Sequence, residues 1–245
     1  MFVPKRRRGV EILDDPATPP AVRERSLRDV GRSNTLLGGT RAVLAELARL
    51  WPSLGSASTL LDVGTGLADI PQRARELAIR AGVSLWVVGV DEAETLARAA
   101  QRALDGSVCA DARWLPFGDG AIRVVTCSQL LHHFPDDEIP AVLRELDRVA
   151  RDHVVVSDLR RSWIAAGGFW LLAWVLGFHR VTRHDGTVSV LRGFTADELA
   201  AHVHAAIGRR PEVRRHLGYR LTATWRPSGS SQGDPPAIAG SRAGG

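Results

Sequence analysis

Three carboxylates stand where predicted strands end, and two glycines follow the first of them. Asp62 lies in the apolar run LLDV, directly before the turn at residues 64–66, which reads Gly-Thr-Gly. Asp91 ends a second apolar run, VVGVD, and Asp111 follows a third. The carboxyl ends of parallel strands meet at one edge of a sheet, so these acids are expected to lie close together. Glycines there let backbone N–H groups approach a ligand closely.

Each of these acids suits one part of S-adenosylmethionine. A carboxylate at Asp91 can accept hydrogen bonds from both ribose hydroxyls, Asp111 can accept one from the adenine amino group, and Asp62 can hold the methionine ammonium. The charge distribution agrees, because residues 50–150 hold 9 Arg and 14 Asp plus Glu, whereas the whole chain has a net charge of +5. The sequence therefore predicts a cationic ligand in a locally acidic domain.

With these motifs the chain resembles class I S-adenosylmethionine-dependent methyltransferases, and it is similar to those of quinone and polyketide biosynthesis. The resemblance covers roughly residues 30–226. The matching segments are LLDVGTGLADI (60–70), VVGVDEAETLARAA (87–100), ADARWLPFGDGAIRVVTCSQLLHHFPD (110–136) and RGFTADELAAHV (192–203). One position departs from the pattern: Ala68 replaces the third glycine of the usual Gly-x-Gly-x-Gly turn.

The resemblance implies an α/β fold with a Rossmann-like sheet of seven strands, mostly parallel with the last antiparallel, and an N-terminal helical cap. It implies S-adenosyl-L-methionine as the cofactor. We assign cofactor binding to Asp62, Gly64, Thr65, Gly66, Asp91, Glu92, Asp111, Ala112, Ser128 and Gln129. Neither cysteine, Cys109 or Cys127, has metal-ligand spacing around it; both fall on predicted core strands, and no metal is expected.

The acceptor is expected to meet the cofactor after the fourth strand, at the run LLHHF (130–134). We assign His133 as the base, if the acceptor needs one, and His132 as an acceptor contact; ordinary packing is the alternative for both. Asn34 lies in a polar turn before a glycine pair and is assigned to substrate binding. It belongs to a predicted helical cap at 21–50 that closes over the cofactor, for which a simple packing role is the alternative.

An apolar segment, Trp163 to Phe178, lies within a predicted lid at 160–192. We assign Trp170 and Trp174 to acceptor binding, since aromatic side chains offer a large apolar area to a flat or lipid-like molecule. This predicts a small hydrophobic or aromatic acceptor, such as a phenolic polyketide or quinone precursor of secondary metabolism, methylated on oxygen or carbon. Sixteen residues fall short of the about 20 needed to span a bilayer, so contact of 163–178 with a membrane surface is the alternative to a lid.

The strongly basic composition, with a pI near 10.4, comes from 31 arginines and a single lysine, Lys5. No interleaving of basic and aromatic residues accompanies it, so no nucleic-acid partner is expected. We predict a flexible N-terminus at 1–20, a methyltransferase domain at 21–226 and a disordered tail at 227–245. Within the domain, the cap is predicted to be two helices separated near Gly38-Gly39, and the fifth strand to end at Asp158. Thr195, with Glu198 three residues on, predicts a capping box at the start of a late helix. A cytoplasmic location follows from the lack of an apolar leader, with membrane association as the alternative. The oligomeric state stays open.

Two other functions compete with methyl transfer. A nicotinamide-dependent oxidoreductase needs a third glycine in Gly-x-Gly-x-x-Gly, and Asp69 occupies that position here, where it would repel a pyrophosphate. The second alternative is a non-catalytic subunit that binds S-adenosylmethionine. The sequence does not exclude it, because methyl transfer requires few catalytic side chains.

Overall fold

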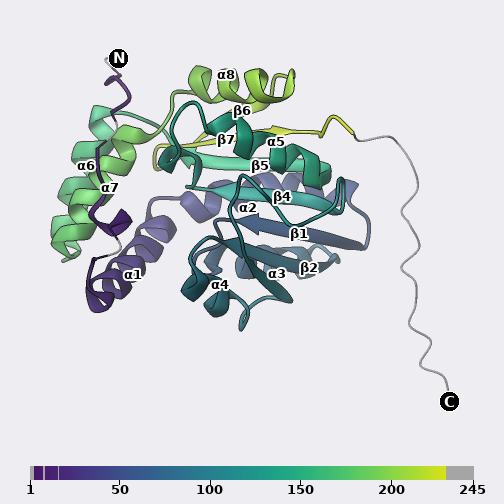
Figure 1. The fold of residues 1–245 in the computed structure, drawn as a ribbon, viewed down its shortest axis with the longest axis horizontal. Coiled ribbons are helices and arrows are strands. Elements are labelled where there is room, and N and C mark those ends of the chain that lie inside the picture. Colours follow the sequence, from purple (N-terminus) through teal and green to yellow (C-terminus); the bar gives the residue numbers. More distant parts are fainter. Residues whose placement is uncertain (1–2, 8, 16, 230–245) are drawn as a thin grey trace.

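The computed structural model describes residues 3–7, 9–15 and 17–229, and its centre is one seven-stranded sheet in the order β3-β2-β1-β4-β5-β7-β6 (Figure 1). β7 runs antiparallel to both of its neighbours, and the pairs among β1 to β5 are parallel. This confirms the predicted Rossmann-like fold. The strands are β1 Ala57–Val63, β2 Ser84–Asp91, β3 Gly106–Cys109, β4 Ile122–Ser128, β5 Ala150–Leu159, β6 Glu212–His216 and β7 Arg220–Trp225.

Helices cover both faces of this sheet. The helices are α1 Pro20–Leu36, α2 Gly39–Leu50, α3 Asp69–Arg80, α4 Glu94–Ala100, α5 Ile139–Val149, α6 Trp163–Val175, α7 Arg180–Arg192 and α8 Ala196–Ile207. Successive strand residues point to opposite faces, so Leu60 packs with α2 and α3 whereas Leu61 packs with α5 and α8. The two resulting clusters are buried, and they form the core that holds the strand ends in place.

Several predicted boundaries are confirmed by local geometry. The break between the two helices of the cap falls at Gly38, whose φ of 76° is the left-handed conformation that glycine adopts readily. Thr195 and Glu198 form the predicted capping box at the start of α8. Ala68, which replaces the third glycine of the turn, takes the left-handed conformation with a φ of 63°. The glycine turn thus keeps its shape despite the substitution.

The segment predicted as a lid folds into α6 and α7, which pack together with α1 at one end of the sheet, on the left in Figure 1. Ser162 caps α6 by accepting a hydrogen bond from the N–H of Ile164 at 3.1 Å. The two helices meet where the ring of Phe169 lies against Gly186, since a Cβ there would stand 2.2 Å from that ring. Within the described residues, no helix combines the length and the apolar character needed to cross a bilayer.

The described residues of the N-terminus, for which the sequence predicts a flexible lead, pack along α7. The N–H groups of Ile12 and Leu13 each donate to the Asp185 carboxylate at 2.9 Å, and Arg161 Nε donates to the carbonyl of Pro4 at 2.7 Å. Tertiary hydrogen bonds therefore hold a segment whose prolines and charges suggested flexibility. Most of the predicted disordered tail, residues 230–245, lies outside the described residues. Cys109 is exposed at the end of β3, contrary to its predicted core position.

Candidate functional site

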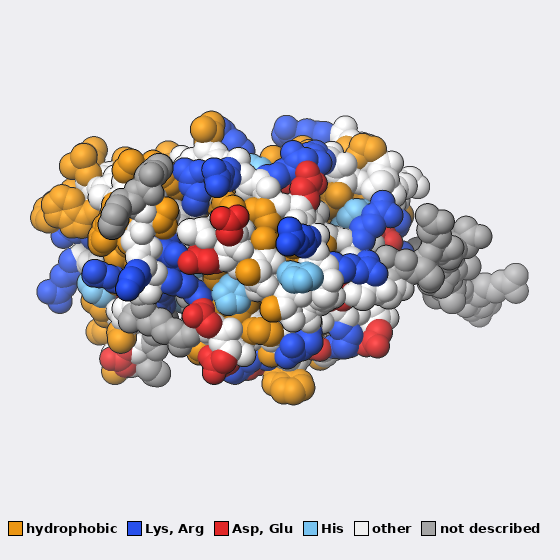
Figure 2. All heavy atoms as spheres, turned by 90° about the horizontal axis from the view of Figure 1, so that it is seen from above, with side chains coloured by type: hydrophobic (Ala, Val, Ile, Leu, Met, Phe, Trp, Pro, Cys, Tyr) orange, Lys and Arg blue, Asp and Glu red, His pale blue; other side chains and the backbone are white. Residues whose placement is uncertain are grey.

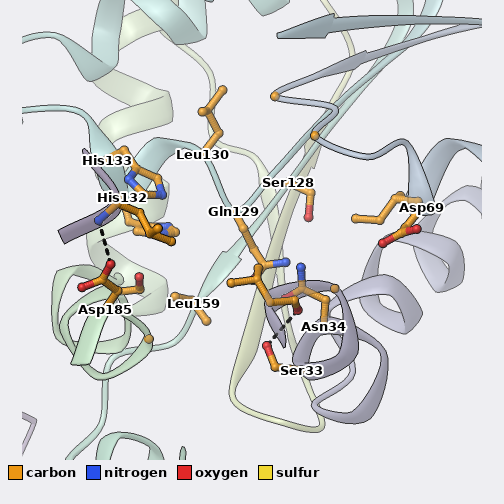
Figure 3. Close-up of a pocket in the computed structure, with 18 of the residues that line it drawn as sticks. Ser33, Asn34, Asp69, Ser128, Gln129, Leu130, His132, His133, Leu159 and Asp185 are labelled. Atoms are coloured by element: carbon orange, nitrogen blue, oxygen red, sulfur yellow. Dashed lines mark hydrogen bonds between the residues drawn. The ribbon is translucent and has the colours of Figure 1, made fainter. Parts of the chain in front are cut away.

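A cavity of about 1050 Å³ lies at the carboxyl ends of the parallel strands. Its walls come from the ends of β1, β2, β4 and β5, from α1, α6 and α7, and from the N-terminal segment. Figure 3 shows the histidine pair 132–133 and Asp185 on one side of the cavity, Asp69 on the other, and Gln129 and Asn34 between them. Pockets for one drug-sized ligand run up to about 1,000 Å³, so this cavity has room for a nucleoside and a second molecule.

The glycine turn and Asp91 form one wall of the cavity. Asp91 Oδ2 accepts a hydrogen bond from the N–H of Gly66 at 2.9 Å, and its Oδ1 accepts one from the N–H of Ala93 at 3.0 Å. Burial raises the pKa of Asp91 above its usual value, although these two bonds oppose the shift. Each carboxylate oxygen keeps a further lone pair, so the pair of oxygens fits the two hydroxyls of a ribose. Open space beside Gly66 leaves room for a ligand there.

Asp62 is a buried acid on the cavity wall. Its Oδ1 accepts a hydrogen bond from Thr126 Oγ1 at 2.7 Å. Burial raises the pKa of Asp62 to about 6, and the nearby charge of Asp91 adds to this, while the hydrogen bond from Thr126 opposes it. A buried carboxylate is stabilised in its ionised form by a neighbouring cation. The ammonium of S-adenosylmethionine would supply that cation.

The affinity for S-adenosylmethionine should therefore depend on pH through Asp62. The folded-state pKa of about 6 lies above the ordinary 3.8. Protonation thus stabilises the protein without cofactor, and this contribution is lost as the pH rises from about 4 through 6. Binding the ammonium of S-adenosylmethionine requires Asp62 in its ionised form instead. We therefore expect the affinity for S-adenosylmethionine to fall about tenfold per pH unit below about 6. Calorimetry across this range measures it, and Asp62→Asn should bind weakly with a flatter pH profile. A flat wild-type profile would contradict the assignment.

Ser128 ends β4 and Gln129 follows it, and both line the cavity (Figure 3). The hydroxyl of Ser128 is buried and has no hydrogen-bond partner among the described residues, which leaves it available to a ligand. Gln129 has a φ of 54°, a conformation that is uncommon outside glycine and often marks functional sites. The predicted residues Glu92, Ala112 and Asn34 also line the cavity. Together with Asp62 and Asp91, these groups fit S-adenosylmethionine.

Asp111 is not among the residues that line the cavity, although its neighbours Ala110 and Ala112 are. Its carboxylate accepts hydrogen bonds from Arg113, including one from Nη2 at 2.5 Å. These bonds lower the pKa of Asp111. The adenine contact assigned to Asp111 stays a prediction, and it requires this carboxylate to reach past Arg113.

His132 and Asp158 form a buried pair beside the cavity. The imidazole Nδ1 of His132 lies 2.7 Å from Asp158 Oδ1, and the backbone N–H of His132 donates to Oδ2 at 3.2 Å. The proximity of His132 lowers the pKa of Asp158 against the effect of its burial. An ionised Asp158 accepts the Nδ1 proton and leaves Nε2 of His132 as the acceptor nitrogen, which is the arrangement of a general base.

His133, which the sequence favoured as the base, is less suited to that role. Burial, together with the charges of His132 and Arg192, lowers its pKa to about 3, although 35% of its side chain is exposed. A group with that pKa takes up a proton weakly near neutral pH. The role of His133 as the base stays a prediction, and the pairing with Asp158 makes His132 the better-positioned candidate. Ligand atoms of Glu11, His132 and His133 lie within 4.8 Å of one another, but Arg192 donates to Glu11 at 3.0 Å, and its charge opposes a metal cation there.

The structure does not bring Trp170 and Trp174 to the cavity, so their assignment to acceptor binding is corrected. Both side chains lie about half exposed on the outside of α6. The helix presents Ala165, Gly168 and Phe169 to the cavity instead. Small residues on that side let α6 lie close to the cavity and α7, which leaves the large indoles on the outer side.

Sequence reasoning missed Arg220, a buried cation in the cavity wall. Its Nη1 donates to Gln129 Oε1 at 2.9 Å, and burial lowers its pKa to about 10. Among the described residues, no carboxylate lies within ion-pair distance of it. Buried charges are costly without a partner, so the guanidinium favours an anionic oxygen on a ligand. The only signal in the sequence was an arginine at the start of a strand, which is more often a surface position.

Comparisons with known proteins agree with this site. Residues 60–153 match the family model described as a methyltransferase domain. No curated protein matches the sequence. A solved magnesium protoporphyrin IX methyltransferase from Synechocystis with bound S-adenosylmethionine is 15% identical, with a TM-score of 0.51, over 89% of this chain and 88% of that one. A 1,6-didemethyltoxoflavin-N1-methyltransferase from Burkholderia thailandensis is 21% identical, with a TM-score of 0.54, over 87% and 92%.

A third solved structure, a methyltransferase from Aquifex aeolicus described as dependent on S-adenosylmethionine, is 18% identical, with a TM-score of 0.57, over 81% of this chain and 95% of that one. At these identities the solved structures show a shared fold. The family match adds that residues 60–153 resemble a methyltransferase domain. This favours methyl transfer over the hydride-transfer alternative.

Proposed function

We propose that this methyltransferase transfers a methyl group from S-adenosylmethionine to an oxygen, or to a carbon activated by a neighbouring hydroxyl, of a hydrophobic aromatic acceptor. A phenolic polyketide or a quinone precursor has this chemistry. The observation that carries the proposal is the pairing of His132 with Asp158 at 2.7 Å, in a part of the cavity whose lining includes Leu159, Ile164 and Phe169. A base there has a purpose only if the acceptor must lose a proton.

Three acids and the glycine turn each contact a different part of the cofactor in this proposal. Asp91 binds the ribose, Asp62 faces the ammonium, and Asp111 is the predicted adenine contact. When bound, the cofactor supplies a methyl group made electrophilic by its sulfonium. The protein's part is mainly to align the acceptor with that group and to exclude water.

The acceptor half of the cavity combines apolar side chains with polar ones, and two of the polar groups carry the proposed chemistry. Its apolar lining comes from Leu13, Phe134, Leu159, Ile164, Phe169 and Val190. His132 Nε2 takes the hydroxyl proton of the acceptor while Asp158 keeps Nδ1 protonated and the ring oriented. The Arg220 guanidinium stabilises an anionic oxygen, either on the deprotonated acceptor or on the cofactor's carboxylate.

Substitution of Asp185 tests whether the N-terminal segment closes the acceptor half. Glu11 and Leu13 of this segment line the cavity, and the carboxylate of Asp185 holds the N–H groups of Ile12 and Leu13. Asp185→Ala removes both hydrogen bonds, and a hydrogen bond to a charged carboxylate contributes about 1.5–3 kcal/mol. We expect the KM for the methyl acceptor to rise about tenfold in steady-state assays, with the Kd for S-adenosylmethionine unchanged. Asp119→Ala, at an exposed acid, is the control; equal effects of the two would contradict the closing role.

A panel of acceptors tests the proposed function directly. The panel should contain alkylated phenols, hydroquinones and polycyclic phenols, together with small charged acceptors, and methylated products are identified by mass spectrometry. Turnover confined to hydrophobic phenols supports the proposal. Turnover confined to small charged acceptors, or to hydrophobic molecules without an ionisable proton, contradicts it.

A further inference from the structure

The outer side of α6 carries an apolar stripe exposed to solvent. Trp163, Trp170 and Trp174 are 46%, 51% and 53% exposed, and Leu171 and Val175 are exposed further still. Figure 2 shows a cluster of hydrophobic side chains at the end of the protein where Figure 1 places α6. Most of these positions recur at helical spacing, so they share one side of the helix. An exposed apolar patch of this kind marks an interaction surface.

Positive charge surrounds this stripe. The sequence from 159 to 184 contains four arginines and neither Asp nor Glu, and of these arginines only Arg161 is buried, where it pairs with Glu198. The guanidinium of Arg183 lies 3.6 Å from the ring centroid of Trp174, and that of Arg7 lies 5.6 Å from the ring of Trp163. Arg180 is exposed at the start of α7. Tryptophan and arginine around an apolar helix face are typical of a helix at the interface of an anionic bilayer.

We propose that α6 docks the protein on an anionic lipid bilayer, with the helix lying in the plane of the membrane surface. The helix has 13 residues, which at about 1.5 Å per residue is about 20 Å, well short of the about 30 Å hydrocarbon core. The stripe therefore enters the interface from the side, with its indoles at headgroup depth. The basic rim complements phosphate headgroups, and this charge match favours a lipid surface over a second copy of this basic chain.

The docked orientation places the mouth of the cavity at the membrane. Ile164 lines the cavity and is also 61% exposed, so it lies at the boundary between the cavity and the outer side of α6. Gly168 lines the cavity beside it, and nothing stands within 4 Å of where its side chain would be. An acceptor dissolved in the bilayer would reach His132 past these two residues without crossing water. This route rests on the proposed function, whereas the docking itself does not.

Vesicle flotation tests the docking without acceptor or turnover. The full chain is mixed with vesicles of phosphatidylcholine alone, or of phosphatidylcholine and phosphatidylglycerol in equal parts. We expect binding to the anionic vesicles that weakens with salt, and at least tenfold weaker binding by Trp170→Ser/Trp174→Ser. The matched control is Trp86→Ser/Trp114→Ser, because those indoles are also exposed but lie on β2 and after β3. Both double variants should keep the wild-type affinity for S-adenosylmethionine.

The outcomes separate the alternatives. Absence of wild-type binding to anionic vesicles, or equal binding by the two double variants, overturns the proposal. A lipid-free dimer that the α6 variant dissociates and the control does not would assign the stripe to a protein interface instead. Failure of the acceptor panel with normal flotation would overturn the proposed acceptor class and leave the docking standing.

Discussion

Asp91→Ala should weaken the binding of S-adenosylmethionine by about a hundredfold or more. The two carboxylate oxygens are placed for two ribose hydroxyls, and a hydrogen bond to a charged group contributes about 1.5–3 kcal/mol. Loss of two such bonds costs about 3 kcal/mol at the lower end, which is about a hundredfold in Kd. The substitution also removes the acceptor for the N–H of Gly66, so the glycine turn loses its anchor. Isothermal titration calorimetry measures the change.

The control for Asp91 is Glu94→Gln, three residues along the chain. Glu94 is exposed and pairs with Arg98 at 2.6 Å, and it is not among the residues that line the cavity. Its substitution should leave the Kd within twofold of wild type. Thermal unfolding shows whether each variant is folded. A folded Asp91→Ala protein with wild-type affinity would remove the cofactor site from this edge of the sheet.

The sheet and several helix boundaries were predictable because residues close in the sequence determine them. Apolar runs ending in acids marked the strands, the glycine pair marked the break between α1 and α2, and Thr195 with Glu198 marked the start of α8. Each of these features stabilises its element through neighbours within a few residues. The cofactor half of the cavity followed from them, since the strand ends of a parallel sheet share one edge.

The orientation of α6 was not predictable in the same way. The helix is apolar on nearly every side, so its periodicity does not say which side faces the protein. Contacts with other elements decide it: Phe169 packs against Gly186, and the alanines of α6 are buried while the tryptophans are not. For this reason the sequence analysis placed Trp170 and Trp174 at the acceptor site, whereas both lie on the outer side of α6.

Long-range pairing also determined the parts of the site that sequence reasoning missed. Arg220 reaches the cavity because β7 pairs with β5, with Leu159 opposite Arg220. The Glu11 side chain reaches it because α7 binds the N-terminal segment. Asp158 was recognised as the end of the fifth strand, but its partner His132 lies 26 residues earlier, and only the alignment of β4 with β5 brings them together. No local pattern predicts such contacts.

His132→Gln should lower kcat by at least a hundredfold on a phenolic acceptor, because a positioned general base contributes about 10²–10⁴-fold. Glutamine keeps much of the size and polarity of the side chain but cannot take up the proton. The Kd for S-adenosylmethionine should stay near wild type, since His132 lies in the acceptor half. Asp158→Asn should cause a comparable loss, because the amide lacks the charge that stabilises the imidazolium and can hold the imidazole in the wrong tautomer. Rapid-quench or steady-state assays with the best acceptor measure both.

Two further variants decide which histidine acts. His133→Gln removes the neighbouring imidazole, whose ring centroid lies 4.3 Å from that of His132, and His204→Gln changes an exposed histidine on α8. Both should keep kcat within a few fold of wild type. If His133→Gln proves the more damaging variant, or if His132→Gln keeps a wild-type kcat, His132 is not the base, and its pairing with Asp158 serves packing alone.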